Sequence, residues 1–470
     1  MIPVVSMLDR TAAVLGLGRT GRSACRALTE GGARVWAWDD DAPRRLEAAG
    51  SGVRIVDLDI CNWRRVDRLV LSPGIPVRHP RPHKVVQSAR RAGVGITGDI
   101  ELLVENQPAR RIVGITGTNG KSTTTALAAE LLRAGGRGVQ LGGNIGLPVL
   151  DLLPKPVEDI YVLELSSYQL ELTEHLACSV AVILNLSPDH LDRHGGMAGY
   201  ARAKRRILRN QQAKDWAIVG VDDDHGRELV ESLRSHRRQR VLPISGQTAA
   251  DADVYVQGGV LHDAIDGHPG EAVADLRAIE SLPGTHNWQN AAAAYAVARV
   301  HGVPAAAALN GMRRFRGLPH RMELAGTLGN VRFVNDSKAT NPEAAAKSLG
   351  CYGAAYWIAG GRPKDGGFAS LAPALAGVRR AYLIGEAEAQ LADFLDGRVS
   401  YARCGELASA VREAAADARR EGIADAVVLL APACASFDQF ANFEARGDAF
   451  KAQVAELAGR TVDGGGGESA

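Results

Sequence analysis

The chain has 470 residues, of which 46% are hydrophobic and 23% charged, and a net charge of +2. This length exceeds what one hydrophobic core supports and predicts about two to four domains. The near-neutral charge gives no general reason to expect nucleic acid or an anionic membrane as a partner. The local basic runs AKRRILRN and SHRRQR are best interpreted as solvated helix faces.

Cysteine spacing and the lack of long apolar segments both indicate a protein of the reducing cytosol. The 6 cysteines are widely spaced without a CxxC pair, which disfavours a disulfide framework or a zinc ribbon. The N-terminus lacks the pattern of a signal peptide, and no run of about 18 uncharged apolar residues follows. We therefore expect a soluble, cytoplasmic protein without membrane insertion, and we expect it to be a monomer.

The first hundred residues alternate short apolar segments with amphipathic ones, as a small open parallel sheet requires. A helix is predicted in RTGRSACRALTEGG, which ends at glycine. Strands are predicted at 12–18, 34–41, 54–59 and 68–76. We place this domain at 1–97.

Two further α/β units are predicted, a central one at 98–316 and a C-terminal one at 317–460, followed by a flexible tail at 461–470. Central strands are expected at 111–117, 160–166 and 180–187, with helices at 121–136 and 287–302. C-terminal strands are expected at 331–336, 354–361, 380–385 and 425–433. The predicted fold class is α/β, with three domains in series: a Rossmann-like first domain, a central P-loop-type ATP-binding domain and a Rossmann-like C-terminal domain.

The segment VGITGTNGKSTTT at 113–125 predicts a phosphate-binding loop, although Ile115 stands where the common pattern has its first glycine. Backbone N–H groups at a helix start bind anions, and Gly117 and Gly120 let the chain wrap closely. Lys121 can reach phosphates, and a following hydroxyl can bind Mg²⁺. The alternative is a glycine-rich strand–helix connection that binds no ligand.

A second glycine motif, GLGRTGRS, follows the first predicted strand. Its glycines match GxGxxG, and Asp39 ends the next strand, as in dinucleotide-binding domains. Taken alone, this motif indicates an NAD-dependent oxidoreductase.

Further motifs change that interpretation. GITGTNGKSTTT, GGNIGLP, LELSSYQLE, LNLSPDHLDRH, HNWQNAAAA, GLPHRME, NDSKATNP and PACASFDQF with NFEARGDAF follow in this order. From about Gly16 to Phe450 the chain resembles the Mur ligases. The resemblance implies an ATP-dependent acid–amino-acid ligase of peptidoglycan precursor synthesis. It further implies the substrates UDP-N-acetylmuramoyl-L-alanine and D-glutamate, joined through an acyl phosphate with release of ADP and phosphate.

The resemblance also implies roles for individual residues, with ATP and two Mg²⁺ ions as cofactors. The implied ATP-binding residues are Gly117, Thr118, Asn119, Gly120, Lys121, Ser122, Thr123, Asn287, Asn290, Arg321 and Asp336. The implied metal ligands are Ser122, Glu164, His190 and Lys204, the last in a carbamylated form. The implied catalytic residues are Lys121, His190, Lys204 and Lys338.

Substrate-binding residues are implied in all three domains. For the UDP-muramoyl group they are Gly18, Arg19, Thr20, Asp39, Ser72, Gly74 and Asn144; for D-glutamate they are Asp189, Thr340, Lys364, Ser436 and Phe443. Residue patterns alone leave plainer alternatives open. Glu164 could be a surface carboxylate at a strand end, Lys204 a lysine of an amphipathic helix, and Asn287 a helix cap.

Three other functions remain open from the sequence: a related ligase with another amino acid or folate as substrate, an oxidoreductase, and a non-catalytic nucleotide-binding regulator. For a ligase with ATP contacts on two domains, we expect domain closure about a hinge near Arg316 and Gly317.

Overall fold

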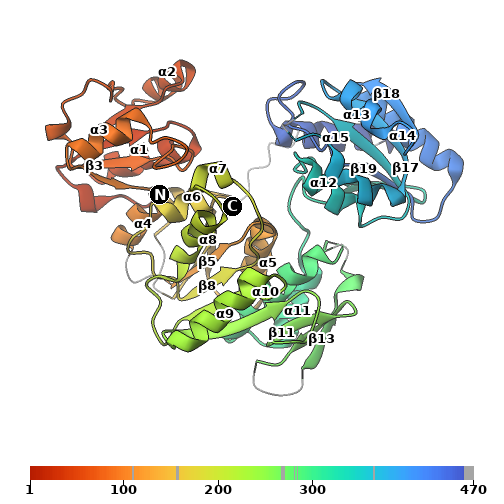
Figure 1. The fold of residues 1–470 in the computed structure, drawn as a ribbon, viewed down its shortest axis with the longest axis horizontal. Coiled ribbons are helices and arrows are strands. Elements are labelled where there is room, and N and C mark those ends of the chain that lie inside the picture. Colours follow the sequence, from red (N-terminus) through yellow and green to blue (C-terminus); the bar gives the residue numbers. More distant parts are fainter. Residues whose placement is uncertain are drawn as a thin grey trace. The chain divides into compact units, whose positions relative to one another are not determined.

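The computed structural model describes residues 1–107, 111–154, 158–265, 270–279, 281–282, 284–363 and 366–459. The chain forms two compact units, shown in Figure 1. The first comprises Met1–Ala278 and Thr285–Phe315, and the second comprises Ile279–Gly284 and Arg316–Ala470. The first unit contains two sheets and the second contains one.

The N-terminal sheet is parallel throughout, in the order β2-β1-β3-β4. Its central strand β1 is buried along its whole length, as expected for a strand covered on both faces. The strands are β1 (Thr11–Leu15), β2 (Arg34–Trp38), β3 (Arg68–Leu71) and β4 (Gly95–Thr97); the helices are α1 (Arg19–Glu30), α2 (Ala42–Gly50), α3 (Lys84–Arg91) and α4 (Asp99–Asn106).

The strand predicted at 54–59 is wrong. In this segment only Ile55 forms an isolated bridge, to Ala37 of β2. The Asp57 carboxylate accepts a hydrogen bond from the Asp59 N–H at 2.9 Å, a local turn that competes with extended pairing.

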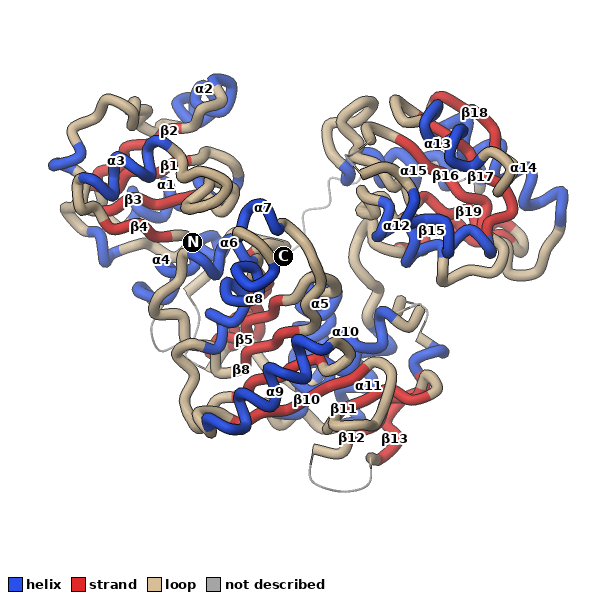
Figure 2. The backbone as a smooth tube through the Cα atoms, in the orientation of Figure 1, coloured by secondary structure: helices blue, strands red, loops and turns tan. Residues whose placement is uncertain are grey.

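The central sheet has the order β13-β12-β11-β10-β9-β8-β5-β7-β6, with antiparallel pairing only at the β11–β12–β13 end. Figure 2 draws strands in red and labels β5, β8, β10, β11, β12 and β13 of this sheet. The strands are β5 (Arg111–Thr116), β6 (Val139–Gly143), β7 (Ile160–Glu164), β8 (Val180–Ile183), β9 (Trp216–Gly220), β10 (Arg240–Ser245), β11 (Val254–Gln257), β12 (Val260–Asp263) and β13 (Glu271–Asp275).

The helices of the central part follow these strands, and α10 and α11 both pack against α5. Helix α11 follows α10 within the same unit, so the helix predicted at 287–302 is not the last one of this part of the chain. The helices are α5 (Lys121–Ala134), α6 (Ser167–Glu171), α7 (Leu191–His194), α8 (Met197–Arg205), α9 (Asp224–His236), α10 (His286–Val300) and α11 (Ala305–Arg314).

The sheet of the second unit has the order β14-β15-β19-β16-β17-β18, and only its edge strand β14 is antiparallel. The strands are β14 (Glu323–Leu328), β15 (Val331–Asn335), β16 (Ala355–Gly360), β17 (Val378–Ile384), β18 (Tyr401–Gly405) and β19 (Val427–Leu430). The helices are α12 (Pro342–Leu349), α13 (Glu388–Leu395), α14 (Leu407–Glu421) and α15 (Phe443–Leu457).

The predicted α/β class and its predominantly parallel sheets are confirmed. The limits of the three domains and the role given to each stay predictions, and the tail at 461–470 lies outside the described residues. Within the described part of the chain, no helix has the length and apolarity needed to span a bilayer.

Candidate functional site

The predicted phosphate loop connects β5 to α5 in the middle of the central sheet. Hydrogen bonds to Asn185 hold it against the loop after β8: the Thr118 N–H donates to the Asn185 carbonyl at 2.9 Å, and the Asn119 N–H to the Asn185 side chain at 2.9 Å. The Asn185 amide also donates to the Asn119 carbonyl at 3.2 Å. The loop thus lies where ligands bind in α/β sheets, at the carboxyl ends of the strands.

Gly120 precedes α5 with a φ of +84°, and a Cβ atom there would lie 2.0 Å from Oδ1 of Asn290. That Asn290 oxygen accepts a hydrogen bond from Thr124 of α5 at 3.2 Å, and the Asn290 amide donates to Asn287 at 3.0 Å. The two predicted ATP-binding asparagines are therefore neighbours at the start of α10, and Asn290 lies against the loop. Thr285 is the N-cap of α10, so the capping role for Asn287 is wrong.

Lys121 bends back over the loop, and its ammonium group donates to the carbonyls of Gly117 and Thr118 at 3.1 and 2.8 Å. Ser122 and Thr123 follow it in the first turn of α5, Ser122 being buried. These positions match the geometry expected of a loop that binds phosphate.

Lys204 is only 1% exposed, which excludes the surface-helix alternative. Lys204 belongs to α8, and its Nζ donates to the Gly117 carbonyl at 2.7 Å. Burial, helped by the charge of nearby Lys121 and opposed by Asp189 and Glu164, lowers the pKa of Lys204 to about 7. A substantial fraction of Lys204 is therefore a neutral amine at physiological pH, and its Nζ lies against the phosphate loop.

Glu164 ends β7, beside β5 in the sheet, and is 1% exposed. Its Oε1 accepts a hydrogen bond from Asn144 at 2.7 Å, whereas Oε2 is buried and has no hydrogen-bond partner among the described residues. An unpartnered buried carboxylate oxygen is costly and is typical of a cation ligand. The surface-carboxylate alternative for Glu164 is therefore wrong.

Asp189 and His190 are the last two residues of the loop between β8 and α7. His190 has a φ of +51°, its side chain is 52% exposed, and its Nε2 lies 3.5 Å from the Asp189 carboxylate. Its ring packs beside Tyr168 of α6, with centroids 5.2 Å apart. His190 and Lys204 therefore differ sharply in exposure, although both are predicted metal ligands.

Two residues that the sequence analysis did not single out brace the phosphate loop. Gln289 of α10 accepts from the Asn185 amide at 2.8 Å and donates to Asp222, after β9, at 2.7 Å. Asp222 in turn accepts from the Ser245 hydroxyl at the end of β10 at 2.6 Å. Gln289 lies inside HNWQNAAAA, but nothing in that pattern separates it from a surface glutamine.

The first domain contains a cavity of about 380 Å³ at the carboxyl ends of β1, β2 and β3. The structure brings together here all the predicted substrate residues of this domain: Gly18, Arg19, Thr20, Asp39, Ser72 and Gly74. Asn144 is not among the lining residues, but Arg19 donates to the carbonyl of Gly146, in the same loop as Asn144, at 2.7 Å. Asp40, Arg44 and Ile75 line the cavity without having been predicted.

The Asp39 carboxylate accepts hydrogen bonds from the backbone of its own domain. Its two carboxylate oxygens accept hydrogen bonds from the N–H groups of Leu17 and Asp41, at 2.6 and 2.9 Å. It therefore fixes the glycine loop after β1, which in a dinucleotide-binding domain would lie under the diphosphate.

In the second unit, Asp336 and Lys338 follow β15. Burial raises the pKa of Asp336 to about 6, while a hydrogen bond from the Ser348 hydroxyl and the charge of nearby Arg321 act in the opposite direction. The Lys338 ammonium lies over the Phe443 ring, 3.8 Å from its centroid. The Thr340 N–H donates to the Lys338 carbonyl at 2.8 Å, so these predicted residues form one cluster of loops.

Arg446 joins this cluster to the loop after β19 and was not predicted. It is 1% exposed and donates to the Ser337 hydroxyl at 3.0 Å and to the Cys434 carbonyl at 3.2 Å. Ser436, two residues after Cys434, is 2% exposed. The motif NFEARGDAF contains Arg446, yet a single arginine there reads as a helix-surface residue. The predicted Lys364 lies outside the described residues.

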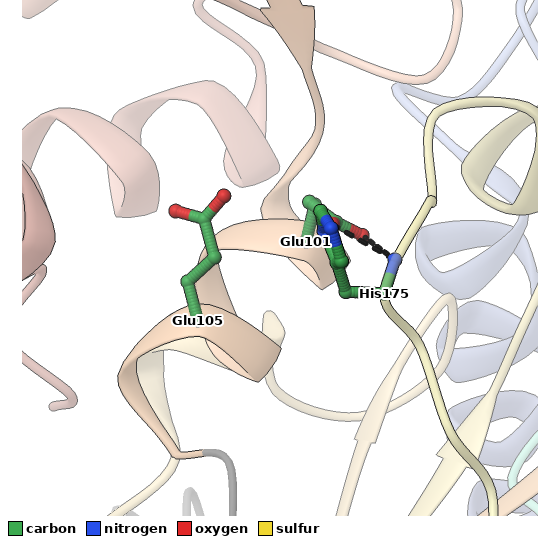
Figure 3. A group of neighbouring side chains, drawn as sticks. All are labelled: Glu101, Glu105 and His175. Atoms are coloured by element: carbon green, nitrogen blue, oxygen red, sulfur yellow. Dashed lines mark hydrogen bonds and ion pairs between the residues drawn. The ribbon is translucent and has the colours of Figure 1, made fainter. Parts of the chain in front are cut away.

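A further group of possible metal ligands, Glu101, Glu105 and His175, appears in Figure 3. Glu101 already accepts hydrogen bonds from the Glu174 and His175 N–H groups, at 2.8 and 3.0 Å, and from the His175 ring at 2.5 Å. Glu105 pairs with Arg68 at 2.5 Å. These carboxylates attach α4 to its neighbours and are not a candidate metal site.

The comparisons with known proteins agree with this geometry. Residues 115–298 match the Mur ligase middle domain, and residues 320–434 match the Mur ligase glutamate ligase domain. Among solved structures, the UDP-N-acetylmuramate-alanine ligase of Thermotoga maritima is similar in fold, with a TM-score of 0.58 and 17% identity, covering 95% of this chain and 99% of that one.

Full-length relatives are much closer in sequence. The UDP-N-acetylmuramoylalanine–D-glutamate ligase of Phenylobacterium zucineum is 50% identical, over 98% of this chain and 100% of its own. The enzyme of the same name from Rhodospirillum rubrum is 47% identical, over 97% of each chain. With both domain models matched in order and half of the residues identical along the whole length, the chain belongs to the Mur ligase family.

Proposed function

We propose that the chain joins D-glutamate to UDP-N-acetylmuramoyl-L-alanine at the expense of ATP, in peptidoglycan precursor synthesis. The names and full-length identity of its relatives support this substrate pair. The observation that carries the proposal concerns two buried residues beside the phosphate loop. Lys204 donates to the loop backbone, and Glu164 has one carboxylate oxygen without a hydrogen-bond partner among the described residues. An ATP-dependent ligase needs such groups to hold metal and phosphate together.

The loop residues fit ATP and Mg²⁺. Gly117 and Gly120 have φ values of +155° and +84°, which let the loop wrap with its N–H groups toward an anion, and Lys121 supplies positive charge. Ser122 and the open oxygen of Glu164 would hold one Mg²⁺, and His190 with carbamylated Lys204 a second. Bound Mg²⁺ would offset the negative charges of the γ-phosphate and the acceptor carboxylate.

Carbamylation of Lys204 is supported by its burial and by its pKa of about 7, because only a neutral amine adds carbon dioxide. The product would carry the negative charge that a metal ligand needs. Intact mass spectrometry of the native protein in bicarbonate, with Lys204→Arg as control, tests this. An unmodified Lys204, together with no bicarbonate rescue of Lys204→Ala, would remove the second metal assignment.

The reaction requires two displacements. A carboxylate oxygen of the alanyl group attacks the γ-phosphorus, and the bond to the bridging oxygen breaks to release ADP. The amino nitrogen of D-glutamate then attacks the acyl carbon, the bond to the phosphate oxygen breaks, and the nitrogen loses a proton. Asp189 would bind the incoming amino group, while Lys338 and Arg321 would stabilise charge on the transferring phosphoryl group.

The first-domain cavity suits the UDP portion of the acceptor. Arg19 and Thr20 lie at the start of α1, where N–H groups and helix dipole favour a diphosphate. In the second unit Thr340, Ser436 and the Phe443 backbone would bind D-glutamate, together with Lys364. An oxidoreductase has no use for the phosphate loop, so we do not propose one.

One assay tests the proposal: phosphate release with ATP, Mg²⁺ and UDP-N-acetylmuramoyl-L-alanine, comparing D-glutamate, L-glutamate, L-alanine and diaminopimelate. We expect release above background with D-glutamate. Release with another amino acid instead would keep the family but reject the substrate. Absorbance at the nicotinamide band in place of phosphate release would favour the oxidoreductase.

A further inference from the structure

We propose that Arg193 is a positioning residue for the acceptor pocket: from α7 it holds the stretch 75–79, whose first residue, Ile75, lines the pocket. This inference rests on the proposed function for the identity of the acceptor. It assigns to Arg193 a task separate from metal binding and separate from the phosphate loop.

The guanidinium of Arg193 reaches the first domain from α7. Nη2 donates to the Ile75 carbonyl at 2.7 Å, and Nη1 donates to the His79 carbonyl at 3.3 Å. Ile75 lines the cavity beside Ser72 and Gly74. A planar fork that bonds two carbonyls of one segment fixes both the position and the direction of that segment.

Arg193 is itself held firmly on the central side. Its guanidinium lies 4.9 Å from the Tyr168 ring centroid, and Nη1 lies 4.0 Å from Oε2 of Glu171. Tyr168 in turn packs between the rings of His190 and His194, at 5.2 and 5.4 Å. The Arg193 side chain is 9% exposed, so these contacts leave it little freedom to turn away.

The segment that Arg193 holds depends on such contacts. It lies between the end of β3 and the start of α3 and belongs to neither a helix nor a strand. Gly195, two residues after Arg193, approaches it closely as well, since a Cβ there would lie 3.0 Å from the His79 ring. Without the guanidinium, Ile75 and the neighbouring Ser72 and Gly74 would lose one of their supports.

The phosphate loop is held by other residues. Asn185 and Lys204 bond its backbone directly. Removal of Arg193 should therefore weaken binding in the first-domain cavity while leaving ATP binding nearly unchanged. A residue needed only for general folding would affect both sites alike.

The test compares Arg193→Ala and Arg193→Lys with Arg206→Ala. Arg206 is a matched control, because it also donates to main-chain carbonyls, those of Leu170 and Thr173, but entirely within the central part. Calorimetric titration with UDP, and with UDP-N-acetylmuramoyl-L-alanine, gives the affinity of the cavity. Steady-state kinetics then give the KM for acceptor and for ATP.

For Arg193→Ala we expect Kd for UDP and KM for the acceptor to rise about tenfold, with KM for ATP changed by less than about twofold. Arg193→Lys keeps the charge but can bond fewer carbonyls, so an intermediate rise is expected. Amide hydrogen exchange should speed up in residues 74–80 but not in 165–172. Arg206→Ala should alter neither UDP affinity nor exchange in 74–80.

Unchanged UDP affinity in both Arg193 variants would overturn the inference, as would an equal loss in Arg206→Ala or wild-type protein that fails to bind UDP. If Arg193→Ala does not fold, Arg193→Lys decides by the same criteria. The proposed function fails separately: wild-type protein that binds UDP but releases no phosphate with D-glutamate would reject the ligase activity and leave the role of Arg193 standing.

Discussion

Gly120 meets two requirements that few other residues could satisfy. Its φ of +84° lies in the left-handed region, where a side chain costs about 1–2 kcal/mol. A Cβ would also lie 2.0 Å from the Asn290 oxygen that binds Thr124. The left-handed φ affects the stability of the fold, whereas the close contact with Asn290 also affects the predicted nucleotide site.

Gly120→Ala separates these effects when it is compared with Gly136→Ala. Gly136 has a φ of +75° and open space around its Cβ position, so it shares the strain without the overlap. Gly136→Ala should lose about 1–2 kcal/mol of stability by thermal unfolding, and Gly120→Ala at least as much, because its Cβ also overlaps Asn290. Only Gly120→Ala should raise KM for ATP, by about tenfold or more. Equal KM values in the two variants would contradict the role given to this contact.

Asp336 should make stability depend on pH. Burial raises its pKa from 3.8 to about 6, so between these values the folded protein binds more protons than the unfolded chain. The free energy of unfolding therefore falls as pH rises through this window, and the loss is complete above pH 6.

Asp336→Asn removes this titration. We expect the variant to gain stability relative to wild type as pH rises from about 4 to 7, by about 1–3 kcal/mol, measured by thermal unfolding of the full chain. Ser348→Ala serves as a second comparison, since its hydroxyl donates to Asp336 and its loss should raise the Asp336 pKa further. Parallel stability curves for wild type and Asp336→Asn would show that Asp336 titrates normally.

Lys204 illustrates what the sequence leaves undetermined at a single residue. Its flanking pattern, GYARAKRRIL, is compatible with a surface lysine, and residue spacing favours that interpretation. Its burial depends on α8 lying beside the β5–α5 loop, a contact between segments about ninety positions apart in the chain. The resemblance pointed to Lys204, whereas periodicity could not.

At the scale of elements, the carboxyl ends of β8, β9 and β10 are joined by one series of side-chain hydrogen bonds. Ser245, Asp222, Gln289 and Asn185 connect these strand ends through α10 to the backbone of Asn119 in the phosphate loop. Such a connected series holds the loop in one shape before a ligand binds.

Gln289→Ala tests this series, and Gln211→Ala is its matched control. Gln211 is also a buried glutamine, and it donates to the Cys178 and Trp216 carbonyls at 3.1 and 2.8 Å, near the starts of β8 and β9. Both variants should lose about 1–3 kcal/mol of stability. Only Gln289→Ala should raise KM for ATP, by about three- to thirtyfold. If Gln211→Ala raised KM equally, the effect would be one of sheet stability.

Elements with strong local patterns were predictable, and those that depend on distant pairing were not. The buried strands β5, β7, β8, β16 and β19 coincide with predicted apolar runs, because strands covered on both faces are apolar throughout. The antiparallel strands β12 and β13 are short and partly exposed, and the segment at 54–59 has a strand-like composition but turns instead. Most site positions came from the resemblance rather than from residue patterns, and the bracing residues Gln289, Arg193 and Arg446 came from neither.

At the scale of the whole molecule, the predicted ATP-binding residues belong to both compact units: Lys121 to the first, and Arg321 and Asp336 to the second. The chain passes from the first unit to the second at Phe315 and Arg316, next to Gly317, and it also crosses between the units on either side of Ile279–Gly284. A ligase that uses both sets on one nucleotide requires the units to adopt a defined arrangement when substrates are bound.

We expect small-angle X-ray scattering to show a smaller radius of gyration for the protein with a non-hydrolysable ATP analogue, Mg²⁺ and acceptor than for the free protein, because charge on the phosphates attracts the cations of the second unit. Lys121→Ala, which should bind nucleotide weakly, should show a smaller change.

Gly317 has a φ of +80°, and a Cβ there would meet only ordinary contacts, so Gly317→Ala stiffens the connection without overlap and should lower kcat. Gly329 is the control: it lies in the β14–β15 turn with a φ of +61°, and Gly329→Ala should leave kcat unchanged. Identical scattering with and without ligands, or equal kcat in the two glycine variants, would reject a hinge at this position.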